Sequence, residues 1–315
     1  MKFITLKSSQ LRSSDYFALQ TLFKRCFNRE MSTEWFQKKY KSPLLDGESY
    51  LGLMVDDSGV IVGSMTIIPF KYVYFNKPYV FGNLIDLMID PDHRNNISNF
   101  ENIYNLLIKE VMGKIDFLYC VPNQNSYLYF IKILKWKIVG KLNYYIFPIK
   151  FNKIKFMLRH FNFVAVLLEK FIYWVSIPFL FRKYSFNITR KNDQNFQNYR
   201  FDKSYQVVAS NECKSTYKIY DEDGIKTAYI VDFHPMSTKW LSKTVNQILK
   251  QERENIDLVL FISFRKLKIW NLIKVPLNHE PRKLNLIGTC LNKDLEIEIF
   301  NLQNWHFTLS DFDVR

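Results

Sequence analysis

The chain has 315 residues, of which 48% are hydrophobic and 17% are aromatic. This composition supplies packed cores for two domains of ordinary size and excludes an intrinsically disordered protein. The formal net charge is +14 at pH 7. Because the basic residues are spread along the chain and lysine is far more common than arginine, we expect a lysine-rich solvated surface or a polyanionic small ligand rather than a nucleic-acid partner.

The cysteines Cys26, Cys120, Cys213 and Cys290 are widely scattered and form no C-x-x-C pair. A disulfide framework or a structural zinc site would show clustered spacing, so no metal site is predicted. Residues 1–10 are short of apolar side chains and do not resemble a signal peptide. We therefore expect a cytoplasmic protein.

The first part of the chain begins with two helices and three strands. Residues 15–27 carry apolar side chains at helical spacing, and Ser32 opens a second helix that stops before Pro43. Alternating and apolar runs separated by turns then predict strands at residues 50–55, 60–75 and 79–89.

Four further elements complete residues 1–150. The sequence predicts a helix that starts with a capping box at residues 98–101, a buried strand at 115–121, a helix capped by Asn125 or Ser126, and a closing hairpin at 136–149. Together the elements imply a mixed sheet of the α/β (α+β) class, with its central strands feeding helices.

Residues 151–200 differ in character and are predicted to connect two domains. Residues 161–181 are overwhelmingly apolar but contain the adjacent pair Glu169 and Lys170, which would be expensive in lipid. We interpret this stretch as an apolar helical connector, with attachment to a membrane surface as the alternative. Residues 187–203 are polar and are predicted to be a linker.

The last part, residues 201–315, partly repeats the first. A hairpin around Gly224, a helix opened by Ser237 and a buried strand occur in the same order as in the first half. Asn255-Ile256-Asp257 before this strand echoes Lys114-Ile115-Asp116 before residues 117–121. The pattern indicates duplication of one α/β unit.

The stretch from Gly82 to Asn99 is the most informative for chemistry. A strand ends in a polar loop that turns at once into a helix. The unpaired N–H groups and the dipole of a helix N-terminus form a natural seat for a pyrophosphate, and Arg94 adds a permanent cation there.

Several motifs in this chain resemble those of GNAT (N-acetyltransferase) superfamily proteins. The start of the family's acyl-CoA loop is similar to Ile89-Asp90-Pro91-Asp92-His93-Arg94. The family's asparagine turn resembles Pro122-Asn123-Gln124-Asn125-Ser126, and the entry to its last strands resembles residues 134–140. Residues 35–43 and 304–313 resemble segments of two-module members found with surface-polysaccharide genes. The resemblance implies tandem GNAT-like modules, the second degenerate because residues 231–235 lack the loop's arginine and glycines.

The resemblance also implies an activity and the residues that carry it. The chain would transfer an acetyl group from acetyl-CoA, or another acyl group from acyl-CoA, to a small-molecule amine acceptor such as an amino-sugar nucleotide. Asp86 is the candidate base and Tyr129 the candidate acid. The implied cofactor-binding residues are Leu87, Met88, Ile89, Arg94, Asn95, Asn96, Ile97, Ser98, Asn99, Asn123 and Ser126.

Alternatives to this activity remain open from sequence. Asn95, Asn96 and Ile97 stand where the family has glycines. Asparagine tolerates left-handed backbone conformations, so the loop can still form, but a non-catalytic scaffold or binding protein with the same fold is the rival interpretation. A transferase for longer acyl chains or membrane-linked acceptors is the second, because of the apolar residues 161–181.

Overall fold

The computed structural model describes residues 1–44, 46–150, 185–210, 213–234, 236–263, 271–295 and 297–312. The predicted connector at residues 161–181 lies outside these described residues. Up to residue 150 the helices and strands are β1 (Lys2–Lys7), α1 (Ser13–Phe27), α2 (Thr33–Lys39), β2 (Tyr50–Val55), β3 (Ile61–Tyr74), β4 (Lys77–Ile89), α3 (Ile97–Val111), β5 (Phe117–Cys120), α4 (Gln124–Leu128) and β6 (Lys137–Pro148).

From residue 185 the elements are β7 (Ile188–Arg190), α7 (Gln194–Arg200), β8 (Gln206–Ser210), β9 (Cys213–Glu222), β10 (Ile225–His234), α8 (Thr238–Glu252), β11 (Leu258–Ser263), β12 (Ile273–Lys274), β13 (Leu284–Cys290) and β14 (Trp305–His306). Most strands join one sheet in the order β1-β2-β3-β4-β5-β13-β6-β11-β10-β9-β8. The β4–β5 and β10–β11 pairs are parallel, whereas the other pairs along this path are antiparallel. The predicted mixed α/β sheet is confirmed.

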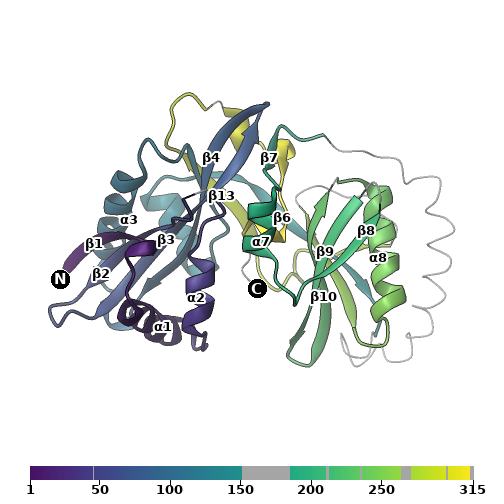
Figure 1. Ribbon diagram of the computed structural model, residues 1–315, viewed down its shortest axis with the longest axis horizontal. Coiled ribbons are helices and arrows are strands. Elements are labelled where there is room, and N and C mark those ends of the chain that lie inside the picture. The colour runs from purple at the N-terminus through teal and green to yellow at the C-terminus, as the bar shows by residue number, and fades with distance from the viewer. Residues whose placement is uncertain are drawn as a thin grey trace.

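Three hydrophobic cores hold the helices against the sheet. One core joins α1 and α2 to β2, β3 and β4, and a second packs α3 against the same strands and β5. The third and largest core gathers β6, β9, β10, α8 and β11 and extends to β3 and β4. Figure 1 shows the consequence: a lobe with α1, α2 and α3 and a lobe with α8, β9 and β10, connected through β6, β7 and α7.

The same hydrogen-bond arrangement occurs in both lobes. Asp116, before β5, accepts the backbone N–H of Val80 at 2.8 Å, and Asp257, before β11, accepts that of Lys226 at 2.8 Å. In return, the N–H of Asp116 donates to the carbonyl of Val80 at 2.8 Å, and the N–H of Asp257 donates to the carbonyl of Lys226 at 2.7 Å. The short sequence echo at Ile115-Asp116 and Ile256-Asp257 therefore reflects a repeated local structure.

The two lobes exchange strands. β6 pairs with β11 of the second lobe, and β13 pairs with β5 of the first as well as with β6. The closing hairpin predicted at residues 136–149 is therefore wrong: these residues form the single strand β6, whose partners lie more than 100 residues further along the chain. Alternation and turn residues carry no signal for partners at that distance.

Four other local predictions are corrected. The helix after the β4 loop starts at Ile97 and is capped by Asn96, not by the box at residues 98–101, and α4 is capped by Asn123. Residues 187–203 are not a linker, since they contain β7 and α7, and Arg190 and Arg200 are buried there. Residues 231–234 are the end of β10 rather than a loop.

Asp232 illustrates why that segment is a strand. Its side chain is 4% exposed and lies 3.4 Å from Arg190, which also pairs with Asp311 at 2.7 Å. This buried charge cluster ties β7, β10 and the C-terminal segment together. Among the described residues, no helix has the length and apolar character needed to cross a membrane.

Candidate active site

Strands β4 and β5 diverge halfway along β4. They pair in parallel only at Phe81, Gly82 and Asn83. β4 then continues to Ile89 with β3 on one edge, while β5 ends at Cys120. The pairing of β4 with β3 shifts register beside Asp86, whose φ of 48° is unusual for a residue with a side chain. Residues 84–89 consequently have no strand of the described residues paired on the β5 side.

A cleft of about 540 Å³ occupies this opening, and we call it the β4–β5 cleft. Residues 83–87 of β4 form one wall, and residues 120–123 with Ser126 form the other. Helices α1 and α2 close it from the side with Phe23, Trp35 and Lys39. An elongated ligand could run along the free edge of β4 there as an added strand does.

The loop between β4 and α3 offers backbone donors. Asn96 caps the helix through the N–H of Ser98 at 3.0 Å, and the side chain of Asn99 holds the loop by donating to the carbonyl of His93 at 3.0 Å. Within the described part of the chain, the N–H groups of Asn95, Asn96 and Ile97 have no hydrogen-bond partner. These three donors lie at the positive end of a 15-residue helix, where an anion is favoured by the helix dipole and by free N–H groups.

Arg94 also contacts the end of β4 and helix α1. Its Nε donates to the carbonyl of Ile89 at 2.7 Å, and its guanidinium lies beside the thiol of Cys26. The side chain thus ties the loop to the end of β4 while remaining exposed. Burial raises the pKa of the Cys26 thiol, although the Arg94 charge acts in the opposite direction.

Asp86 lies in a small buried polar cluster between β4 and α2. One carboxylate oxygen is 2.6 Å from Nζ of Lys39 and the other accepts the hydroxyl of Tyr40 at 3.1 Å. The side chains of Lys39 and Asp86 are only 6% and 9% exposed. Burial, followed by the charge of Asp86, raises the pKa of Tyr40 well above its usual range, so Tyr40 remains a hydrogen-bond donor.

The structure brings some of the predicted site residues together and not others. Asp86, Leu87, Asn123 and Ser126 all line the β4–β5 cleft, whereas Met88 is buried in the core beside α1 and α2. Tyr129 lines neither this cleft nor the pocket described next. Its ring packs on Phe100 at 5.6 Å between centroids, and the residue is 39% exposed.

Sequence reasoning did not single out Lys39, Asn83 or Phe312. Lys39 falls in residues 35–43, a segment with a family resemblance, but nothing in the sequence pairs it with Asp86. Asn83 donates to the backbone carbonyl of Asp311 at 3.3 Å, which brings the C-terminal segment to the cleft. Such contacts depend on tertiary structure and leave no local signal.

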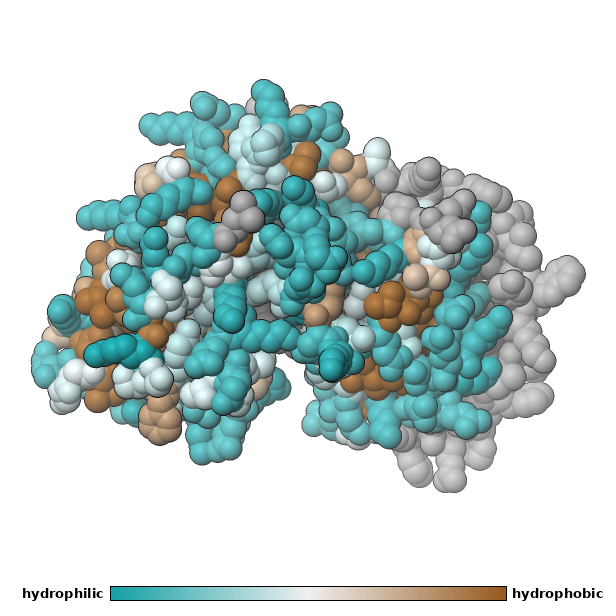
Figure 2. Space-filling view, viewed as in Figure 1, coloured by the Kyte–Doolittle hydropathy of each residue, from teal (hydrophilic) through white to brown (hydrophobic). Residues whose placement is uncertain are grey.

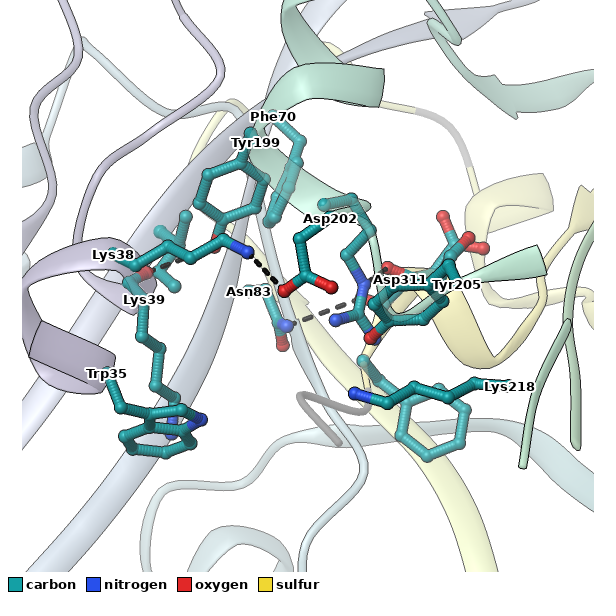
Figure 3. Close-up of a pocket in the computed structure, with 14 residues that line it drawn as sticks. Trp35, Lys38, Lys39, Phe70, Asn83, Tyr199, Asp202, Tyr205, Lys218 and Asp311 are labelled. Atoms are coloured by element: carbon teal, nitrogen blue, oxygen red, sulfur yellow. Dashed lines mark hydrogen bonds and ion pairs between the residues drawn. The ribbon is translucent and has the colours of Figure 1, made fainter. Parts of the chain in front are cut away.

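A second, smaller cavity of about 120 Å³ lies between the lobes, and we call it the junction pocket. It is lined by α2, by the end of α7 and the residues after it, by β9, and by residues 310–312. Figure 3 shows Lys38 paired with Asp202 at its upper rim, and Lys218 directed into the pocket from the side opposite Trp35. Trp35, Lys39, Asn83 and Phe312 line both cavities, so the pocket and the cleft are adjacent.

The space-filling view agrees with this arrangement, because the surface is hollowed between the two lobes (Figure 2). The central features of the fold are the split between the parallel strands β4 and β5 and the loop with free N–H groups that leads from β4 into α3. The chain has the fold of the GCN5-related N-acetyltransferases.

Solved structures carry this assignment. The chain is similar to a GCN5-related N-acetyltransferase from Anabaena variabilis, with 11% identity, a TM-score of 0.57, and coverage of 92% of this chain and 73% of that one. A conserved protein of unknown function from Enterococcus faecalis, described as a probable N-acyltransferase, matches with 12% identity, a TM-score of 0.56, and coverage of 95% and 74%. A GCN5-related N-acetyltransferase from Kribbella flavida matches with 9% identity, a TM-score of 0.56, and coverage of 92% and 71%.

No protein-family model and no curated protein matches the sequence. At these identities the structural matches establish the fold, and the activity has to be argued from the site.

Proposed function

We propose that this chain is an acyl-CoA-dependent N-acyltransferase that moves an acetyl group from acetyl-CoA to the amine of a small acceptor. The observation that carries the proposal is the split between β4 and β5, which leaves one edge of β4 unpaired and leads into a loop with three free N–H groups. A scaffold protein has no evident need for an unpaired strand edge inside its sheet, because unpaired backbone groups are costly unless water or a ligand satisfies them.

Acetyl-CoA fits this arrangement by the chemistry of its parts. The backbone of residues 84–87 would bind the amides of the pantetheine arm along the free edge of β4. The N–H groups of Asn95, Asn96 and Ile97, with the α3 dipole, would hold the pyrophosphate. The exposed guanidinium of Arg94 would add positive charge beside them, and Asn123 and Ser126 would border the thioester end.

The chemical step needs a neutral amine next to the thioester carbon. Asp86 is our candidate to accept the amine proton, directly or through a water, because it lines the cleft where the free edge of β4 begins. Lys39 holds the carboxylate in position at 2.6 Å. The amine nitrogen then bonds to the acyl carbon, the carbon–sulfur bond breaks, and the CoA thiolate leaves and is protonated.

The acceptor would enter through the junction pocket, which meets the cleft at Trp35 and Lys39. We propose that the second lobe encloses the acceptor and does not bind CoA, because its corresponding segment is the strand end around Asp232, a buried carboxylate paired with Arg190. An amino-sugar nucleotide remains our proposed acceptor from the sequence resemblance. We also propose a cytoplasmic setting, in which the four free thiols stay reduced.

Binding and turnover test the proposal in sequence. Acetyl-CoA at about 100 times its dissociation constant should stabilise the folded chain by roughly 2.7 kcal/mol in thermal or urea unfolding. Acetyl transfer is then followed by release of free thiol across a panel of amines. Absence of stabilisation by acetyl-CoA, CoA and long-chain acyl-CoA alike would contradict the proposal.

The two rival functions give different results in the same assays. A scaffold predicts no transfer to any amine even where CoA binds. A long-chain transferase predicts stronger stabilisation by a palmitoyl donor than by acetyl-CoA. The scaffold alternative is tested because Asn95, Asn96 and Ile97 stand in the loop in place of glycines, and their side chains crowd its N–H groups.

A further inference from the structure

Four cations line the junction pocket, and two of them form no ion pair among the described residues. Of the cations that line it, Lys38 is paired with Asp202 at 2.7 Å and Lys39 with Asp86 at 2.6 Å. Arg200 and Lys218 line the same pocket, yet within the described ranges of the chain neither forms an ion pair with a carboxylate.

Arg200 is the more unusual of the two. The residue is 8% exposed, and among the described residues its guanidinium donates only to backbone carbonyls, from Nε to Ser310 at 3.1 Å and from one terminal nitrogen to Leu309 at 3.5 Å. A guanidinium has five N–H donors and a charge that is costly to bury without a counter-ion. Arg200 is therefore a buried cation at the wall of the pocket, and some of its N–H donors are not used by the described residues.

Lys218 faces the same space from β9. Its amino group lies over the rings of Tyr205 and Tyr220, at 4.7 and 4.8 Å from the centroids, and Figure 3 shows its end directed into the pocket. Burial lowers the pKa of Lys218; the charge of Asp202 opposes this shift, whereas those of Arg200 and Lys38 reinforce it. These positive groups are thus close enough to repel one another.

We propose that the acceptor carries an anionic group, a carboxylate or a phosphate, which binds between Arg200 and Lys218. An anion there would receive charge-assisted hydrogen bonds from both residues and relieve their mutual repulsion. The acceptor's amine would then point toward Trp35 and Lys39, which line both the pocket and the β4–β5 cleft that contains Asp86. This inference rests on the proposed acyl transfer for the role of the amine, but not for the anion site itself.

Anion binding is measured first, without CoA. Inorganic phosphate and acetate are titrated separately against the full chain and followed by thermal unfolding. Lys218→Met should weaken binding of the preferred anion about tenfold or more, because a hydrogen bond to a charged group is lost. Lys243→Met is the matched control, since Lys243 is exposed and also lies over an aromatic ring, that of Trp240 at 4.3 Å, but outside the pocket.

Turnover then separates the two sources of the anion. Glucosamine 6-phosphate is compared with glucosamine, and glutamate with glutamine, as acetyl acceptors. A higher kcat/KM for glucosamine 6-phosphate over glucosamine supports a phosphorylated amine, and one for glutamate over glutamine supports an amino acid. In either case Lys218→Met should abolish the preference while leaving the affinity for acetyl-CoA unchanged.

The outcomes that overturn the inference differ from those that overturn the proposed function. Equal anion affinity in Lys218→Met and wild type, or equal kcat/KM for charged and neutral acceptors, rejects the anion site. Failure of acetyl-CoA to bind rejects acyl transfer. The anion site is then still tested by the effect of Lys218→Met on the binding of phosphate or acetate.

Discussion

Variants of the buried pair Lys39 and Asp86 can distinguish the pair's contribution to stability from the role of Asp86 in catalysis. Lys39→Met keeps the length of the side chain but leaves the Asp86 carboxylate without its cation at 2.6 Å. Removing one partner of a buried pair costs roughly 3–5 kcal/mol. We expect the lower end, about 3 kcal/mol, because Asp86 borders a cleft that admits water.

The double variant Lys39→Met, Asp86→Asn removes both charges. It should be more stable than the sum of the single changes predicts, with a coupling energy of roughly 1–3 kcal/mol in urea unfolding. In turnover, Asp86→Asn should lower kcat by roughly 10²- to 10⁴-fold, the usual contribution of a general base. Lys39→Met should lower kcat less, because the carboxylate is still present.

A matched control exists in the same lobe. Asp116→Asn also removes a carboxylate, one that accepts the backbone N–H of Val80 at the far end of β5 from the cleft. It should lower stability and leave kcat per folded molecule nearly unchanged. An unchanged kcat in folded Asp86→Asn, or a coupling energy near zero, would refute the assigned role of this pair.

Three further predictions concern single side chains. Arg94→Ala should weaken CoA binding by roughly 1.5–3 kcal/mol in calorimetric titration, with little loss of stability because the side chain is exposed. Tyr129→Phe tests the proposed leaving-group acid: its position on Phe100, away from both cavities, predicts less than about a twofold change in kcat, whereas an acid at the thiolate requires roughly 10²-fold or more. Burial and a second nearby histidine lower the pKa of His306 to about 4. Between pH 6.5 and 4 mainly the unfolded chain gains this proton, so the free energy of unfolding should fall by on the order of 3 kcal/mol over that range. In urea unfolding, the dependence of stability on pH should be flatter for His306→Gln and unchanged for a variant of an exposed histidine, His279→Gln.

The sequence predicted the local elements of the first lobe because their signals are local. α1, α2 and the strands β2 to β5 follow from periodicity, turn residues and the cap at Ser32, and the structure confirms them within a few residues. The cap of α3 was assigned wrongly because Ser98 and Glu101 match a capping box, while Asn96 lies nearer the loop and satisfies the N–H of Ser98 itself.

The site was predictable only in part. The β4–loop–α3 segment is contiguous in sequence, so its candidates could be named from pattern and resemblance. Lys39 and Arg200 could not be predicted, because each acquires its role from a partner or a cavity wall supplied by a distant segment. Arg200 in particular lay in a stretch whose polarity indicated a linker, although the residue is buried.

Strand exchange explains why the cleft depends on both lobes. β5 pairs with β4 only as far as Asn83 and Tyr119, but β13 continues along the other edge of β5 to Cys120, opposite Ile287. A strand from the second lobe thus supports β5 as it leaves β4. Gly288 makes this possible, because a Cβ at that position would lie 2.2 Å from Cζ of Phe117 and 2.7 Å from the backbone oxygen of Leu118.

Gly288→Ala should therefore disturb β13 and the cleft together. The backbone oxygen of Leu118 cannot move aside as a flexible side chain can, so we expect roughly 1–3 kcal/mol of destabilisation and weaker acetyl-CoA binding. Gly113→Ala is the control: its added Cβ meets nothing within 4 Å, and its φ of 76° carries a cost of only about 1–2 kcal/mol that is confined to the turn after α3. That variant should lose stability without losing affinity for acetyl-CoA. If Gly288→Ala were destabilised but bound acetyl-CoA as tightly as wild type, β13 would support the fold without shaping the cleft, and the donor site would belong to the first lobe alone.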